Sequence, residues 1–113
     1  MWDERNWEQW HRHNPLPNHP WKQQVRWTKH DPARYQNGVN REELELRCVN
    51  EGNELPRGRR ETVRMFVLDV GEVIGASDGE ETMFVYSEWH STGSVHGRPI
   101  TQEEVKKKSK LRS

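Results

Sequence analysis

Two histidines near the end of the chain could do chemistry, because carboxylate and hydroxyl groups lie close to them in the sequence. His90 and His96 follow Glu88 and stand on either side of the segment 91–95. An imidazole with an ordinary pKa can act as a general base or as a metal ligand near neutral pH. A metal-dependent hydrolase or nuclease that uses His90 or His96 with a nearby carboxylate is therefore one hypothesis for this chain.

The same region lacks the established signatures of hydrolytic and metal sites. Ser87, Ser91 and Ser94 could be nucleophiles with Asp69 or Glu88 as the acid, but no nucleophile-elbow sequence accompanies them. The chain has no His-Glu-x-x-His motif, no paired cysteines and no acidic loop with calcium spacing. We therefore expect neither a bound metal nor a cofactor, and we expect the six histidines to be solvated or edge residues: His11, His13, His19, His30, His90 and His96.

Six tryptophans are the most unusual feature of the composition, and five of them lie in residues 1–37. These five either supply the core that the few leucines cannot, or stay partly exposed and anchor a partner protein, since tryptophan is a frequent hot-spot residue. A non-catalytic protein-binding module, a small adaptor or inhibitor-type protein, is our leading hypothesis. Its expected partner-binding residues are Trp7, Trp10, Trp21 and Trp27, with Glu43 and Glu45 steering a basic partner.

Two basic clusters support an alternative function, nucleic-acid binding with tryptophan stacking. One cluster lies between two expected strands and the other lies near the C-terminus. The candidate phosphate-binding residues are Arg57, Arg59, Arg60, Lys106, Lys107 and Lys108, within the segments 57–60 and 106–110. Solvated lysines and a cationic helix end are the simpler interpretation of the second cluster.

Length and composition limit the fold. The 113 residues suffice for one domain, and 18 basic residues balance 18 acidic ones. Although the net charge is zero, the chain divides into segments of different composition. Residues 1–37 are rich in Trp, His and Pro, residues 38–90 are acidic, and residues 91–113 are basic. No apolar stretch approaches the roughly 18 residues of a membrane span, and no signal-peptide core follows Met1. We expect a single soluble, cytoplasmic domain without a membrane partner.

The N-terminal segment is expected to be partly helical. The spacing of Trp7 and Trp10 predicts a helix over about 4–13, which Asn14-Pro15 would end. Residues 21–29 fit either a helix, through Trp21 and Val25, or a strand, and we favour a strand.

The middle of the chain shows the alternation typical of strands. Leu44, Leu46 and Cys48 alternate with charged residues and predict a first strand over 42–48, with its glutamates in solvent and Cys48 as a buried, inert thiol. A second strand is expected over 63–70. The Asp-Gly pair at 78–79 predicts a turn, and 82–89 would form a third strand.

The C-terminal segment holds a polar loop, 91–98, and a helix that begins at Thr101. Thr101 and Glu104 form the pattern of a capping box, in which each side chain bonds the other residue's amide. The expected fold class is therefore α+β: a small twisted antiparallel meander of three to five strands, with the N-terminal segment packed on it and a short C-terminal helix. We favour a monomer over a homodimer, with residues 21–29 covering the uncharged edge 82–87.

Overall fold

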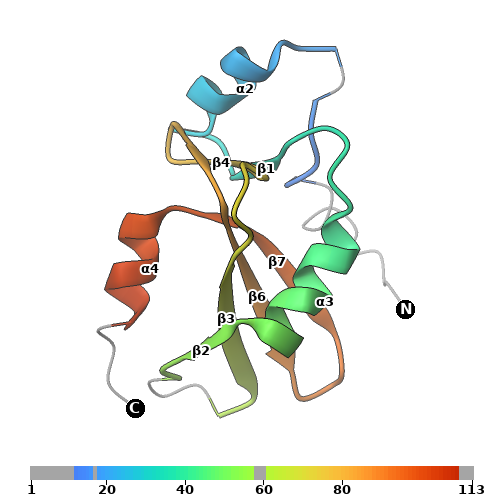
Figure 1. Cartoon of the computed structure of the whole chain (residues 1–113), viewed down its shortest axis with the longest axis vertical. Helices are drawn as coiled ribbons and strands as arrows, with labels where there is room; N and C mark the ends of the chain where they lie inside the picture. The colour runs from blue at the N-terminus through green and yellow to red at the C-terminus, as the bar shows by residue number, and fades with distance from the viewer. Residues whose placement is uncertain (1–11, 17, 58–60, 110–113) are drawn as a thin grey trace.

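The α+β fold and the antiparallel sheets expected from the sequence are confirmed by the computed structural model, which describes residues 12–16, 18–57 and 61–109 (Figure 1). A four-stranded sheet has the order β2-β3-β6-β7 and a three-stranded sheet has the order β1-β4-β5. The larger sheet comprises β2 (Asn53–Leu55), β3 (Val63–Asp69), β6 (Phe84–His90) and β7 (Val95–Ile100). The smaller sheet comprises β1 (Arg34–Tyr35), β4 (Gly75–Ser77) and β5 (Glu80–Thr82).

The second predicted strand, 63–70, is confirmed as β3, and its alternation places side chains on two opposite faces of the sheet. Phe66 and Val85 belong to one core cluster, together with Leu44 and Cys48. Val63, Met65 and Val67 belong to a second cluster on the other face. The four-stranded sheet is therefore buried on both faces, at least along part of its length.

The expected first strand is wrong, because residues 41–51 form the helix α3 (Arg41–Glu51). Asn40 caps this helix by accepting a hydrogen bond from the amide of Glu43. Leu44 and Cys48 are one helical turn apart and face the sheet, whereas Leu46 is 53% exposed. The helix α3 thus covers one face of the larger sheet, a role that we expected the tryptophan segment to have (Figure 1).

The preference for a strand over 21–29 is also wrong. Residues 21–27 form the helix α2 (Trp21–Trp27), which begins directly after Pro20. The helix packs against the β4–β5 hairpin rather than against the larger sheet. The helix expected over 4–13, with Trp7 and Trp10, lies almost wholly outside the described residues.

The predicted Asp-Gly turn is confirmed and joins β4 to β5. Asp78 and Gly79 both have positive φ, 52° and 82°, as the tight turn of a hairpin requires. The expected third strand over 82–89 is split, with β5 ending at Thr82 in one sheet and β6 beginning at Phe84 in the other. The chain therefore leaves the larger sheet after β3, forms the hairpin, and returns at β6.

The polar loop expected over 91–98 is only half right, since residues 91–94 form the turn between β6 and β7 and residues 95–98 belong to the strand β7, Val95–Ile100. The pairing of β7 with β6 covers the uncharged edge 82–87, so the cover comes from β7 and not from residues 21–29. As a result β6 lies inside the sheet, and β7 is its outer strand.

The C-terminal helix is confirmed as α4 (Gln102–Ser109), but only half of the capping box forms. Thr101 Oγ1 accepts from the amide of Glu104 at 3.2 Å, whereas the Glu104 carboxylate binds Arg98 instead of the Thr101 amide. Val105 packs beside Ile100 on the second face of the sheet. Among the described residues, none of the helices has the length and apolar character needed to cross a membrane.

Candidate functional site

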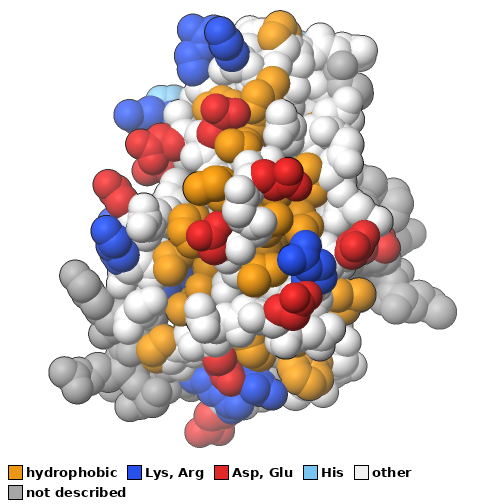
Figure 2. All heavy atoms as spheres, viewed as in Figure 1, with side chains coloured by type: hydrophobic (Ala, Val, Ile, Leu, Met, Phe, Trp, Pro, Cys, Tyr) orange, Lys and Arg blue, Asp and Glu red, His pale blue; other side chains and the backbone are white. Residues whose placement is uncertain are grey.

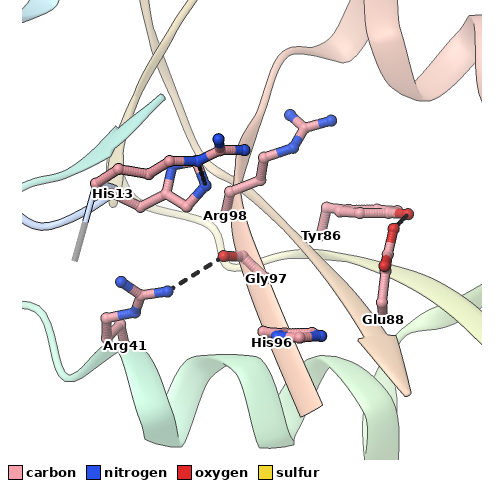
Figure 3. A pocket seen from close by; sticks show the side chains of 8 residues that line it. His13, Arg41, Tyr86, Glu88, His96, Gly97 and Arg98 are labelled. Atoms are coloured by element: carbon pink, nitrogen blue, oxygen red, sulfur yellow. Dashed lines mark hydrogen bonds between the residues drawn. The ribbon is translucent and has the colours of Figure 1, made fainter. Parts of the chain in front are cut away.

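A polar cleft of about 150 Å³ lies beside β7 and is the candidate functional site (Figure 3). Its walls come from α3, from β6 and β7, and from the segment just before Asn14. We call it the β7 cleft. Its lining residues are Arg12, His13, Arg41, Tyr86, Glu88, His96, Gly97 and Arg98.

The register of β6 and β7 explains why polar side chains gather there. Tyr86, Glu88 and His90 alternate along β6 and therefore lie on one face of the sheet. On β7, His96 is the direct cross-strand partner of Glu88, and Arg98 is the partner of Tyr86. The face that holds the second core cluster thus becomes polar and ionisable towards the β6–β7 turn.

Three of these side chains form a close cluster, Glu88, His90 and His96, which we call the Glu-His-His cluster. One potential ligand atom from each lies within 4.8 Å of the others. Oε1 of Glu88 is 3.2 Å from Nε2 of His90, and the rings of His90 and His96 meet edge to face, with 4.6 Å between their centroids. All three side chains are partly buried.

The Glu88 carboxylate is oriented by Tyr86. The Tyr86 hydroxyl donates to Oε2 of Glu88 at 2.6 Å, whereas Oε1 is the oxygen next to His90. The Nε2 atom of His90 is buried and makes no hydrogen bond within the part of the chain that the structure describes. It lies 3.2 Å from Oε1 of Glu88, with which it forms an ion pair when the imidazole is protonated.

Burial lowers the pKa of His96, and the neighbouring His90 and Arg41 lower it further against the opposing effect of Glu88. The imidazole of His96 is therefore neutral over a wider pH range than a solvated histidine. A neutral imidazole can accept a proton or bind a metal ion.

Cationic side chains surround the ring of Tyr86. The Arg98 guanidinium carbon is 5.2 Å from the ring centroid, and Nζ of Lys108, from α4, is 4.9 Å from it. Arg98 also pairs with Glu104, with 2.5 Å between Nη2 and Oε2. The helix α4 therefore contributes both a cation and a competing carboxylate to this side of the cleft.

Arg41 closes the cleft from α3, and a buried network holds it in place. It pairs with Glu45 one turn later, with 3.0 Å between Nη2 and Oε2, and the Tyr35 hydroxyl donates to the same Oε2 at 2.6 Å. Nη2 of Arg41 also donates to the carbonyl of Gly97 at 3.3 Å, as the dashed line in Figure 3 marks. Burial raises the pKa of Glu45, while Arg41 and Tyr35 favour its ionised form.

His13 and Arg12 form the remaining wall. Nδ1 of His13 lies 2.6 Å from the carbonyl of Ala33, and the backbone amide of Tyr35 donates to the carbonyl of His13 at 2.7 Å. Burial lowers the pKa of His13 to about 4, which keeps the ring neutral at physiological pH. Arg12 Nε donates to Nε2 of His13 at 3.4 Å.

Among the residues expected to bind a partner protein, those that the structure describes do not form one surface cluster. Trp21 is half-buried and donates its indole N–H to Glu81, and Trp27 is half-buried against His19. Trp7 and Trp10 lie outside the described residues. Glu43 is exposed as expected, but Glu45 is 3% exposed, because it faces Arg41 and Tyr35 and not the solvent. Glu45 therefore cannot steer a partner.

The candidate phosphate-binding residues that the structure describes lie in two separate places, the loop after β2 and the helix α4. Arg57 is exposed beside Glu54 in the loop after β2, and Arg59 and Arg60 lie outside the described residues. Lys106 and Lys107 are exposed on α4. Lys108 is the residue of this set that contacts Tyr86, one of the residues lining the β7 cleft.

The sequence points to His90 or His96 with a nearby carboxylate such as Glu88, but not to all three together, and it gives no indication that Tyr86 and Arg98 are site residues. Strand alternation was the available signal, since it places 86, 88 and 90 on one face once β6 is assigned. Because a loop was expected over 91–98, the pairing of His96 with Glu88 and of Arg98 with Tyr86 was not predicted. Comparison of the chain with protein-family models, curated proteins and solved structures finds no match.

Proposed function

We propose that the protein is a nuclease, which binds a phosphodiester in the β7 cleft and hydrolyses it. The observation that carries this proposal is the convergence of a carboxylate and two imidazoles within 4.8 Å, beside side chains that are cationic. Such a combination supplies both the groups that activate water and the groups that hold a phosphate. The proposal combines two hypotheses from the sequence, hydrolysis and nucleic-acid binding, and assigns both to the β7 cleft.

The Glu-His-His cluster activates the water. The water oxygen attacks phosphorus, the bond from phosphorus to the leaving oxygen breaks, and that oxygen receives the proton the water has lost. The products are a phosphomonoester and an alcohol. Tyr86 supports this step by fixing the Glu88 carboxylate through its 2.6 Å hydrogen bond.

Arg98, Lys108 and Arg12 bind the phosphodiester. Arginine offers paired N–H donors that match phosphate oxygens, and lysine contributes a point charge. In the absence of substrate Arg98 is engaged by Glu104. We expect a bound phosphate to compete with Glu104 for the Arg98 guanidinium, so that substrate binding depends on ionic strength.

The test is cleavage of labelled single-stranded RNA, single-stranded DNA and duplex DNA, with and without added divalent metal ions. Glu88→Gln should lower kcat/KM at least about 100-fold, whereas Glu42→Gln, an exposed glutamate of α3, should leave it unchanged. Circular dichroism and thermal unfolding establish that both variants are folded. Failure of the wild type to cleave any of these substrates, or full activity of Glu88→Gln, would refute the proposal.

Two lysines of α4 provide a matched pair for the binding step. Lys108→Ala should weaken substrate binding and reduce the slope of log affinity against log salt by about 0.7 to 0.9. Lys106→Ala removes an exposed lysine of the same helix and should have a smaller effect. Equal effects of the two would assign binding to the whole C-terminal segment rather than to the β7 cleft.

A protein-binding module is a second proposal, and Trp89 favours it. Its side chain is 40% exposed and lies against the Arg64 guanidinium, which is 5.4 Å from the ring centroid. Figure 2 shows that hydrophobic side chains on the face viewed there lie among acidic and basic ones, as is common at transient interfaces. Trp89→Ala should abolish a specific complex in pull-down and cross-linking experiments; retention of every complex would count against this surface.

A further inference from the structure

The Glu-His-His cluster has the composition and geometry of a metal centre. We infer that Oε1 of Glu88 and the imidazoles of His90 and His96 bind one divalent cation of the zinc class. The role of this ion in catalysis rests on the proposed nuclease function, but its binding does not. The sequence contains no metal-site motif that would have indicated it, because the ligands come from two paired strands.

The separation of two of the ligand atoms already suits a shared ion. Zinc binds imidazole nitrogen and carboxylate oxygen at about 2.0 to 2.2 Å, so two such ligands at the tetrahedral angle are about 3.3 to 3.6 Å apart. Oε1 of Glu88 and Nε2 of His90 are 3.2 Å apart, close to this range. The third ligand atom is within 4.8 Å, a distance that a small rotation of the His96 side chain would shorten.

His90 supplies an independent observation. Its Nε2 atom is buried and has no hydrogen-bond partner among the described residues, although buried polar atoms are nearly always paired. A cation between His90 and Glu88 would use the lone pair of this nitrogen. A bound ion would therefore give this buried nitrogen a partner.

Tyr86 acts as the outer partner that metal-binding carboxylates commonly have. Its hydroxyl occupies Oε2 of Glu88 at 2.6 Å and leaves Oε1 directed to His90. Because Oε2 accepts the hydrogen bond from Tyr86, Oε1 is the oxygen that binds the ion. Tyr86 is thus a positioning residue, and its removal should weaken metal binding without abolishing it.

The surrounding charges permit a cation. Arg41 is paired with Glu45 and Arg98 with Glu104, so each of these two guanidinium groups has its own carboxylate. Glu88 supplies the negative charge at the cluster itself. Two imidazoles and one carboxylate are a ligand set typical of catalytic zinc, in which the fourth position holds a water molecule. Here the adjoining cavity of about 150 Å³ has room for that water and for part of a substrate.

Isothermal titration of chelator-treated protein with zinc chloride, with no substrate present, tests the site. The wild type should bind one zinc ion per chain. His90→Ala and Glu88→Gln should each weaken binding more than about 100-fold, and Tyr86→Phe about tenfold. His30→Ala, which removes an exposed histidine outside the cluster, is the matched control and should bind like the wild type.

Cobalt substitution provides a second measurement that does not depend on the stability of the variants. Cobalt bound to nitrogen and oxygen ligands gives visible absorption bands, and these should appear at one equivalent and be displaced by zinc. Absence of stoichiometric binding in the wild type, or unchanged binding by His90→Ala, overturns the inference. Metal binding without nuclease activity would reject the proposed function alone, and cleavage without metal binding would reject this inference alone.

Discussion

Arg41 and Glu45 form a buried ion pair one turn apart on α3, and the same arginine donates to the carbonyl of Gly97 on β7. Their side chains are 7% and 3% exposed. One residue thereby joins the helix that covers the core to the outer strand of the sheet. The wall of the β7 cleft is consequently held by the same interactions that stabilise the fold.

Removal of the Glu45 carboxylate should be strongly destabilising. Glu45→Ala leaves the Arg41 charge and the Tyr35 hydroxyl without their shared acceptor, and we expect the free energy of unfolding to fall by about 3 kcal/mol. Glu42→Ala, on the exposed side of the same helix, should change it by less than about 0.5 kcal/mol. Urea unfolding measures both, and similar losses in the two variants would contradict a buried pair.

The stability of the protein should depend on pH through His13. Burial lowers the pKa of His13 from 6.5 to about 4. Between these values the unfolded chain binds a proton that the folded chain does not, so this contribution is complete above pH 6.5 and is lost as the pH falls towards 4. The full shift corresponds to about 3 kcal/mol.

Urea unfolding at a series of pH values checks this dependence. His13→Asn should flatten the profile between pH 4 and 6.5 relative to the wild type. His30→Asn, at an exposed position, should leave the slope intact. A wild-type slope that survives in His13→Asn would show that other groups cause it.

Cys48 should be unreactive in the folded protein. Its side chain is 0% exposed, its thiol donates to the carbonyl of Val85, and burial raises its pKa to about 11. A thiol reagent such as dithiobis(nitrobenzoate) should label it only after unfolding, with a rate that follows the fraction of unfolded chains. Rapid labelling under native conditions would mean that α3 separates readily from the sheet.

The β4–β5 turn should tolerate substitution at Glu80 but not at Gly79. Gly79 has a φ of 82°, which a residue with a side chain adopts only with strain. A Cβ there would lie 3.5 Å from Lys29, an ordinary contact, so the cost of Gly79→Ala comes from the backbone and should be about 1 kcal/mol. Glu80→Ala is the adjacent exposed control, and equal midpoints in thermal unfolding would contradict the argument.

The sequence was sufficient for elements whose signal is local. The Asp78-Gly79 turn, β3 and the α4 cap depend on neighbouring residues, and all three were predicted. The helix α3 was not, because Leu44 and Cys48 satisfy both a period of two and a spacing of four. The exposure of Leu46 decides between them, and only the folded structure reveals it. Asn40, which caps α3, was a local signal that we did not use.

The candidate site was harder to predict, because its residues come from segments far apart in the chain. Glu88 and His90 share a strand, but His96 joins them only through the pairing of β7 with β6. Arg41 reaches the cleft from a helix that was taken for a strand. Glu45 was assigned to the surface for the same reason, since its burial depends on a helical turn that brings it next to Arg41.

Successive side chains of β6 lie on opposite faces of the sheet, so one set of positions must suit the core and the other must suit the candidate site. Tyr86 and Glu88 line the β7 cleft and His90 lies on the same face of the strand, whereas Val85 and Ser87 are completely buried towards α3. Natural variants of this chain should therefore show two interleaved patterns of substitution in one short stretch. Positions 85 and 87 should exchange among residues of similar volume, and positions 86, 88 and 90 should change together or not at all. Loss of the proposed nuclease activity during evolution would erase the second pattern while leaving the first intact.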